Sequence, residues 1–148
     1  MRISAKGRYA LAAVISMAQN YESAEPVTVI SISEKLGISK IYLEQVFSLL
    51  KRGGIVNSLK GSQGGYQLAR MPQQITLSDV LSAVELSIFE PAEDTVSKNA
   101  PEIETAMRLS AFDKMDEALK NIMSGITLQD LAAEAEKHKP EGTIMFYI

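Results

Sequence analysis

The sequence predicts a mainly α-helical protein with one small β-hairpin. Residues 39–52 place apolar side chains at helical spacing behind Ser39, a residue type that favours the start of a helix. Gly53-Gly54 ends this helix, because glycine adopts the left-handed backbone conformation without steric cost. Two short apolar runs, 55–59 and 66–69, then flank the glycine-rich turn 60–65. A helix followed directly by a basic, glycine-tipped hairpin is the layout of a winged helix-turn-helix domain. The helix positions that we assign to the buried face are Ile41, Leu43, Val46, Phe47, Leu49 and Leu50.

The segments before residue 39 supply the rest of the helix-turn-helix. Residues 6–20 carry their apolar side chains on one stripe and predict a first helix. Residues 31–36, preceded by Thr28 and closed by Gly37, predict a short second helix. The tight turn 37–39 then leads into the third helix, as this motif requires. Beyond the hairpin, Thr76 with Asp79 is a capping signal that opens a fourth helix over 80–85.

The composition changes after Glu85. Residues 89–101 are rich in Pro, Glu, Asp, Ser and Asn, which predicts a linker, and helical periodicity returns over 102–124. A helix of about 20 residues is ~30 Å long, more than a small winged domain covers, so we expect it to pair with its copy in a second subunit. Gly125 breaks this helix, and Thr127 opens a last one that ends at Lys137. We find no internal repeats. The predicted organisation is a winged helix-turn-helix DNA-binding domain over 1–86, a linker or effector loop over 87–101, and a dimerisation helix with a C-terminal tail over 102–148.

The composition is that of a globular protein with one core. Its 148 residues, 46% of them hydrophobic, can bury one good core. No apolar run reaches the roughly 18 residues that a membrane span needs, and the N-terminus shows no signal peptide. The absence of cysteine fits a reducing compartment and removes thiolate metal sites and disulfides. We therefore predict a cytoplasmic protein with no membrane partner and no metal site.

The net charge of −3 hides an uneven distribution. Residues 1–75 hold nine Lys and Arg against four acidic residues, a net +5, whereas residues 76–148 hold six against fourteen, a net −8. A basic front and an acidic back orient a molecule on a polyanion, where phosphate contacts supply most of the non-specific affinity. Together with the helix and the hairpin, this asymmetry predicts that the chain binds double-stranded DNA.

The residue patterns of an enzyme are missing. The glycine-rich turn lacks the following helix and the Lys-Ser/Thr pair of a phosphate-binding loop. With one histidine, no cysteine and no paired carboxylates tied to a nucleophile, the chain offers no catalytic constellation. We therefore predict no catalytic residues. A pure protein-interaction adaptor is the competing class, and it predicts no affinity for DNA at low salt.

Four segments carry a family resemblance. They are M-R-I-S-A-K-G-R-Y-A at 1–10, G-I-S-K-I-Y-L-E-Q-V-F-S-L-L-K-R-G-G-I-V at 37–56, K-G-S-Q-G-G-Y-Q-L-A at 60–69 and I-T-L-Q-D-L at 126–131. With these strings the chain resembles the Rrf-type winged-helix transcription regulators, the family that includes IscR, NsrR and CymR, and it is most similar to IscR. The resemblance implies a repressor-type homodimer that reads a palindromic operator with its third helix and its wing.

The resemblance also implies which residues contact DNA. At the N-terminal end of the third helix, Glu44 is placed to accept from cytosine N4 and Gln45 to bond adenine. Lys60 at the wing tip stands where family members often have arginine, and it suits a minor-groove or phosphate contact. The predicted DNA-binding residues are Arg2, Lys6, Arg8, Ser39, Lys40, Tyr42, Glu44, Gln45, Lys60, Gly61 and Gly64. We assign Tyr9, Leu43, Phe47 and Tyr66 to the core.

The segment between the winged domain and the long helix departs from the family. Many relatives bind a [2Fe–2S] cluster there through three cysteines, and the matching positions in this chain are Ala92, Ala100 and Ala106. Alanine cannot coordinate iron. The family's fourth ligand falls on Leu109, the nearby acids are Glu102 and Glu104, and His138 is too distant to substitute. We therefore expect no cofactor in this chain, and a [2Fe–2S] cluster only in a cysteine-bearing parent.

Two interpretations stay open at this point. In the first, the chain is a cluster-less, apo form of a regulator of iron–sulfur cluster assembly. In the second, it is a natural cluster-free member similar to the cysteine-metabolism repressor, which works with a cysteine synthase partner. The tail, residues 143–148, is mostly apolar and ends in a carboxylate, a chemistry that suits docking into another protein. Packing of the tail on the protein's own dimer surface is the simpler explanation.

Overall fold

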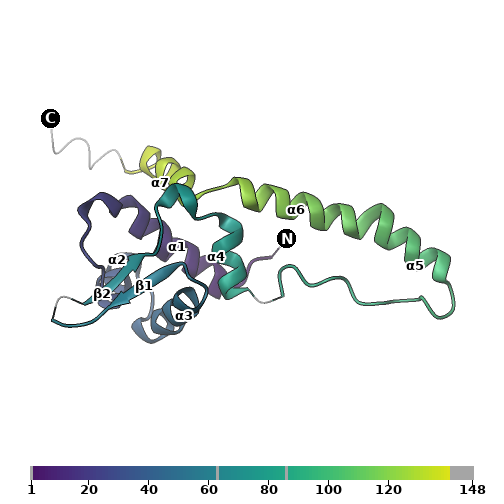
Figure 1. Ribbon diagram of the computed structural model, residues 1–148, viewed down its shortest axis with the longest axis horizontal. Helices are drawn as coiled ribbons and strands as arrows, with labels where there is room; N and C mark the ends of the chain where they lie inside the picture. The colour runs from purple at the N-terminus through teal and green to yellow at the C-terminus, as the bar shows by residue number, and fades with distance from the viewer. Residues whose placement is uncertain (1, 63, 86, 141–148) are drawn as a thin grey trace.

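The computed structural model describes residues 2–62, 64–85 and 87–140. Its helices are α1 (Ala5–Gln19), α2 (Val29–Leu36), α3 (Lys40–Arg52), α4 (Leu77–Val84), α5 (Pro101–Met107), α6 (Asp113–Gly125) and α7 (Leu128–Lys137). Strands β1 (Val56–Leu59) and β2 (Gly65–Leu68) form an antiparallel hairpin, and short 3-10 turns lie at Tyr21–Ser23 and Pro72–Gln74. In Figure 1, α1 to α4, the hairpin and α7 form one body, from which α5 and α6 project as a long arm. The predicted fold class, mainly helical with a small β-wing, is confirmed.

Local capping explains where the first helices begin and end. The Thr28 hydroxyl oxygen accepts from the Ser31 amide at 3.0 Å, and the Ser39 hydroxyl oxygen accepts from the Tyr42 amide at 3.4 Å. Gly37 ends α2 with φ at 68°, a left-handed conformation that favours glycine. As a result, α1, α2 and α3 begin and end within two residues of their expected positions.

The body has one core, to which α1, α2, α3, α4, α7 and the hairpin all contribute. Leu43 and Phe47, assigned to the core from sequence, are fully buried. Ile41 is different, because its side chain is 70% exposed, and its assignment to the buried face is wrong. Ile41 lies two positions before Leu43, which is about 200° around a helix, so the two side chains face in nearly opposite directions.

The hairpin is attached to the body along one edge. Val56 lies opposite Leu68 in the β1–β2 register. Outside the hairpin, Val27 and Tyr66 exchange two backbone hydrogen bonds of 2.9 and 2.7 Å, so the segment before α2 pairs with β2. Gly65 permits this approach, since a Cβ there would lie 2.5 Å from the Val27 carbonyl oxygen. The wing therefore cannot swing freely on its two strands.

The starts of α4 and α7 are joined to each other. Residues 75–77 and 126–128 lie antiparallel and exchange two backbone hydrogen bonds of 2.8 and 2.9 Å. Each helix begins with a capping box, formed by Thr76 with Asp79 in α4 and by Thr127 with Asp130 in α7. The same short string, I-T-L-x-D, occurs at both 75–79 and 126–130 and forms the capping box in each place. This 75–77/126–128 bridge returns the chain to the body, where α7 packs on α1.

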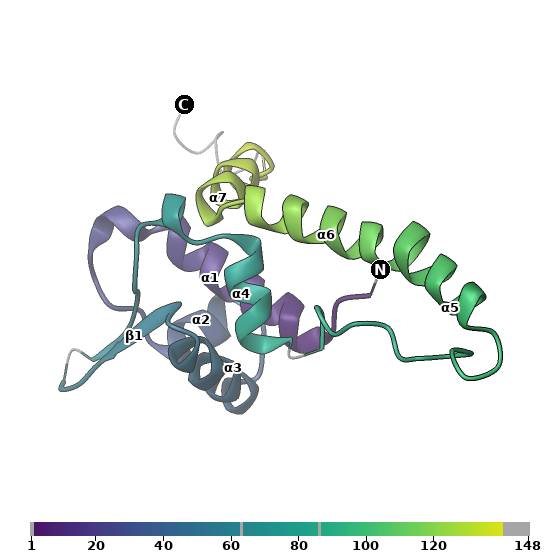
Figure 2. The same cartoon turned by 45° about the vertical axis from the view of Figure 1, so that its right-hand side comes forward.

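The arm is a continuous helical run over residues 101–125. A π-helical segment, Arg108–Phe112, joins α5 to α6 without interrupting the helix. Figure 2 shows the arm reaching away from the body, with the coil that leads to α5 running beside it. The arm's exposed apolar residues are Ile103, Leu109, Met115 and Ile122, at 52, 57, 67 and 62% exposure. Among the described residues, the helices are too short or too polar to cross a membrane.

Candidate nucleic-acid interface

The outer face of α3 is a stripe of exposed side chains. Ile41, Glu44, Gln45, Ser48 and Arg52 recur at helical spacing, and all five are exposed. The four side chains of the inner face are at most 1% exposed, so the helix is locked into the core along its other side. A helix fixed on one face and mostly polar on the other is suited to reading base edges, because it cannot roll when it enters a groove.

Two of the predicted DNA-contacting residues pair with each other at the N-terminal end of α3. Lys40 Nζ lies 3.6 Å from Glu44 Oε1, and both side chains are 53% exposed. Such an exposed pair contributes little to stability, so both groups are available to a nucleic acid. Among all the predicted DNA-binding residues, only Tyr42 and Gly64 are partly buried, and the others are exposed.

Tyr42 lies on the flank of α3 and is half-buried. Its ring meets the Tyr9 ring of α1 edge-on, with centroids 5.3 Å apart and planes at 89°. Tyr9 is itself 38% exposed, so it lies at the rim of the core rather than inside it. The pair fixes α3 against α1 beside the basic N-terminal residues, a packing role that sequence spacing alone does not show.

The wing tip presents Lys60 and Gly61 to solvent. Gly61 has φ at 105°, and its carbonyl oxygen accepts from the Gly64 amide at 3.0 Å. A Cβ on Gly64 would lie 2.5 Å from the Leu59 carbonyl oxygen, so the turn requires glycine at that position. Gln63 lies outside the described residues. The two predicted glycines therefore shape the turn that carries Lys60.

A ring contact links α3 to the wing. The Phe47 and Tyr66 rings lie with centroids 4.6 Å apart and planes tilted by 32°. Phe47 is fully buried, and Tyr66 pairs through its backbone with Val27 on the other side of the wing. Aromatic contacts of this kind stabilise by roughly 0.5–1.5 kcal/mol beyond the area that they bury. The helix and the wing are thus held in one fixed relation.

The N-terminal basic residues Arg2, Lys6 and Arg8 are exposed on the body. Between them, the backbone amide of Ser4 donates to Glu85 Oε1 at 3.0 Å, and the Ser4 hydroxyl donates to the same oxygen. Glu85 follows α4, so this contact ties the end of α4 to the start of α1. Sequence reasoning missed Glu85, because 81 positions separate it from its partner.

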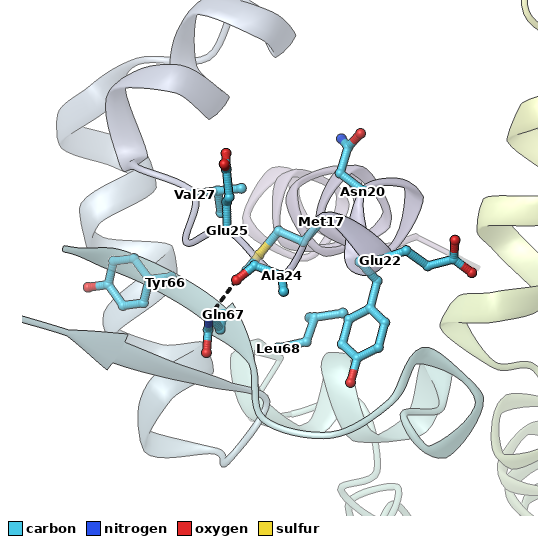
Figure 3. A pocket seen from close by; sticks show the side chains of 10 residues that line it. Met17, Asn20, Glu22, Ala24, Glu25, Val27, Tyr66, Gln67 and Leu68 are labelled. Carbon is cyan, nitrogen blue, oxygen red and sulfur yellow. Dashed lines mark hydrogen bonds between the residues drawn. The ribbon is translucent and has the colours of Figure 1, made fainter. Parts of the chain in front are cut away.

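Behind the hairpin lies a hollow of about 410 Å³, between the end of α1, residues 20–27 and β2 (Figure 3). Met17, Tyr21 and Tyr66 contribute to its lining. Gln67 Nε2 crosses it and donates to the Ala24 carbonyl oxygen at 3.2 Å. Ala24 has φ at 56°, which is uncommon for a residue with a Cβ. This polar contact joins the base of the wing to the connection between α1 and α2.

Glu104 holds the segment before α5 onto that helix. The side chain is buried, with Oε1 accepting from the Thr95 amide at 3.1 Å and Oε2 from the Val96 amide at 3.0 Å. Asp94 adds a turn, since it accepts from the Ser97 amide at 3.0 Å and from the Ser97 hydroxyl. These bonds from Ser97 lower the pKa of Asp94. Carboxylates therefore order a segment in which the cluster-binding pattern would place cysteines.

The three alanine positions do not provide a site for an iron–sulfur cluster. Ala92 lines a cavity of about 120 Å³, Ala100 immediately precedes α5, and Ala106 is exposed on α5. Leu109 is 57% exposed and has no donor atom, while both oxygens of Glu104 are engaged by backbone amides. In the part of the chain that the structure describes, no three His, Cys, Asp or Glu side chains are grouped to hold a metal ion. The residues present do not fit the group.

Comparison with known proteins decides the family. The model of the Rrf2 family, described as iron-dependent transcriptional regulators, matches residues 3–134. The chain belongs to the Rrf2 family. Rrf2 proteins bind DNA, are dimeric, and act as transcriptional regulators rather than enzymes. The family resemblance and the prediction of a non-enzymatic protein are both confirmed.

Individual Rrf2 relatives differ in how much of the chain they match. The HTH-type transcriptional regulator IscR of Cronobacter sakazakii is 48% identical over 88 residues, which cover 60% of this chain and 54% of that protein. The match thus spans about half the length of this relative. The structure of CymR, the global cysteine regulator of B. subtilis, has a TM-score of 0.73 and 32% identity, covering 90% of this chain and 98% of CymR. The T. potens IscR structure has a TM-score of 0.72 and 32% identity, covering 95% and 92%.

Proposed function

We propose that this Rrf2 protein is a repressor-type homodimer that binds a palindromic DNA operator, with α3 in the major groove and the wing on the adjacent backbone. The observation that carries the proposal is the exposed, mostly polar stripe on α3, opposite a fully buried face. Glu44 and Gln45 contact base edges. Lys40, Lys60 and the N-terminal basic residues contact phosphates. The Phe47–Tyr66 ring contact supports joint docking of the helix and the wing.

The distribution of charge supports this orientation. Residues 1–75 carry a net +5 and residues 76–148 a net −8. In Figure 2, α3 and the hairpin lie on the lower side of the body and the acidic α7 on the upper side. A duplex along the lower side therefore meets the basic half, while the acidic half points away.

The arm supplies the dimer contact in this proposal. Its four exposed apolar residues are favourable to bury, at roughly 1.5–3 kcal/mol for each side chain fully removed from water. Met115 and Ile122 lie seven residues apart and so share one face of α6. Pairing two arms along that face covers these two side chains and brings two copies of α3 onto one duplex. Two such helices reach half-sites about 34 Å apart, one turn of DNA.

We infer that operator binding in this chain is independent of an iron–sulfur cluster. The chain has no cysteine, and Glu104 orders residues 95 and 96 through two hydrogen bonds. The protein therefore binds its operator in the same cluster-free form under all conditions. Its affinity for the operator does not respond to iron supply.

Duplex binding tests the proposal directly. Duplexes that the protein retains from a random pool are titrated by fluorescence anisotropy at several salt concentrations. Lys60→Ala should weaken binding to all sequences alike and reduce the salt slope by about 1 per subunit. Lys137→Ala, an equally large charge change on the exposed end of α7, should leave the slope unchanged. Failure to retain any duplex at low salt, or equal slopes for the two variants, would contradict the proposal.

A chelator experiment tests independence from the cluster. Operator affinity of the unchanged chain should be the same with and without an iron chelator. The triple variant Ala92→Cys/Ala100→Cys/Ala106→Cys, purified without air, then tests whether cysteines at these three positions bind an iron–sulfur cluster. A visible absorption band with an affinity that now changes on chelation identifies the chain as an apo form of a cluster sensor. An iron-dependent affinity of the unchanged chain would refute the inference.

A second candidate function follows from the similarity to CymR, the global cysteine regulator of B. subtilis. In that alternative the chain is a cluster-free repressor of cysteine metabolism, and its C-terminal tail docks into a cysteine synthase. The tail, 143–148, lies outside the described residues. Immobilised cysteine synthase should retain the full chain but not a variant that ends at residue 140. Equal retention of both forms, or of neither, would exclude this tail-dependent function.

A further inference from the structure

Ile41 is the only apolar member of the exposed stripe on α3. The stripe's other members, Glu44, Gln45, Ser48 and Arg52, are polar or charged. At 70% exposure, Ile41 is the most exposed of the large apolar side chains that the structure describes. Isoleucine is among the residues most often buried. A lone exposed apolar side chain is ordinary on a protein surface, but on a face proposed to enter a DNA groove it is positioned to pack on an apolar group of the bases.

The position of Ile41 narrows the choice of counterpart. Ser39 caps α3, so Ile41 lies in the first turn of the helix, one turn before Glu44 and Gln45. In a helix-turn-helix protein this end of the recognition helix meets the base edges. The major groove presents hydrogen-bonding atoms on every base pair but only one apolar group, the C5 methyl of thymine.

We infer that Ile41 reads thymine, by packing its side chain on the C5 methyl at one position of each half-site. This inference rests on the proposed DNA-binding function. Glu44 and Gln45 read neighbouring bases through hydrogen bonds, whereas Ile41 adds an apolar contact at the N-terminal edge of the same reading surface. Removing one methyl group from such a contact weakens binding by about fourfold. In a dimer, loss of the methyl in both half-sites weakens it by about fifteenfold.

The experiment removes the thymine C5 methyl and the Ile41 side chain, first separately and then together. Operators retained by the unchanged protein are resynthesised with deoxyuridine in place of thymine. Each new operator changes one position in both half-sites, and the change deletes only the C5 methyl. Dissociation constants are measured for the unchanged chain and for Ile41→Ala at one salt concentration. Alanine keeps the helix, since it has the highest helix propensity and the side chain it replaces is exposed. Circular dichroism of both proteins verifies the fold.

One thymine position should show a preference over deoxyuridine of about fifteenfold with the unchanged chain, and no preference with Ile41→Ala. Ile30→Ala is the matched control, because Ile30 is a 51% exposed isoleucine on α2. Whatever its affinity, Ile30→Ala should keep the thymine preference. The inference is overturned if no position distinguishes thymine from deoxyuridine, or if Ile41→Ala keeps the preference. If no duplex is bound at all, the proposed function falls and this inference falls with it.

Discussion

Replacing Glu104 with alanine should release the segment before α5 while leaving the body folded. Glu104 is 7% exposed, and its carboxylate accepts from two consecutive backbone amides, those of Thr95 and Val96. Both bonds join α5 to the coil that precedes it, and that coil runs apart from the body in Figure 1. Glu104→Ala removes both acceptors at once, and the two amides must then find water.

The size of the effect follows from these two bonds. A hydrogen bond to a charged group contributes about 1.5–3 kcal/mol, which sets an upper figure of about 3–6 kcal/mol for the pair. Part of this is recovered, since Thr95 is exposed and the freed amides bond to water. We therefore expect the local opening free energy to fall by about 2–4 kcal/mol. That corresponds to amide exchange about 30 to 1,000 times faster.

Hydrogen exchange at residues 95 and 96, followed by NMR at neutral pH, measures this directly. Amides in α1 and α3 should keep their protection in Glu104→Ala, because the body does not depend on the carboxylate. Glu102→Ala changes an exposed carboxylate on the same helix and should leave exchange at 95 and 96 unchanged. Equal exchange in Glu104→Ala and the unchanged chain would refute the reasoning, and so would an equal effect of both variants.

Three further expectations concern the dimer, the wing and the last helix. Ile122→Asp places a charge among the arm's exposed apolar residues and should shift the protein to monomer in sedimentation velocity. Gly65→Ala should lower the free energy of unfolding in urea by about 1–3 kcal/mol, because the φ of Gly65 is 157° and a Cβ there would lie 2.5 Å from the Val27 carbonyl oxygen. Gly125→Ala should be neutral or stabilising, since a Cβ at Gly125 has no neighbour within 4 Å. Leu128→Ala should lower the free energy of unfolding in urea by about 2–5 kcal/mol, because Leu128 is fully buried. Leu109→Ala should lower it far less, since Leu109 is 57% exposed. Equal losses would contradict the packing of α7 on the body.

The elements that could be predicted from sequence are those fixed by neighbours in the chain. Thr28 and Ser39 cap helices whose first amides lie three residues away, so short windows of sequence contain the whole signal. Gly61 and Gly64 likewise shape a turn through local contacts. The candidate DNA-contacting surface was predictable for the same reason, since it depends on the third helix and the adjacent turn.

The contacts that could not be predicted join distant segments or involve backbone groups. Glu85 binds Ser4 across 81 positions, and no local pattern marks that pairing. The sequence identifies Glu104 only as an acid near the cluster positions, because its partners are two backbone amides, which every non-proline residue carries. Apolar character alone predicts an inward position for Ile41, although its angle on the helix places it with Glu44 and Gln45.

The 75–77/126–128 bridge attaches the arm to the body near one end, so a small tilt at that end produces a larger displacement at the other. One end of the arm is tied by this bridge to the start of α4, and the other end is connected through residues 87–100 to the far end of α4. The arm's 25 residues span about 37 Å at 1.5 Å per residue. A tilt of about 5° at the tied end therefore moves the tip by about 3 Å. Because α4 contacts α6 as well as α1 and α3, a displacement of the arm reaches first the helix against which α3 packs.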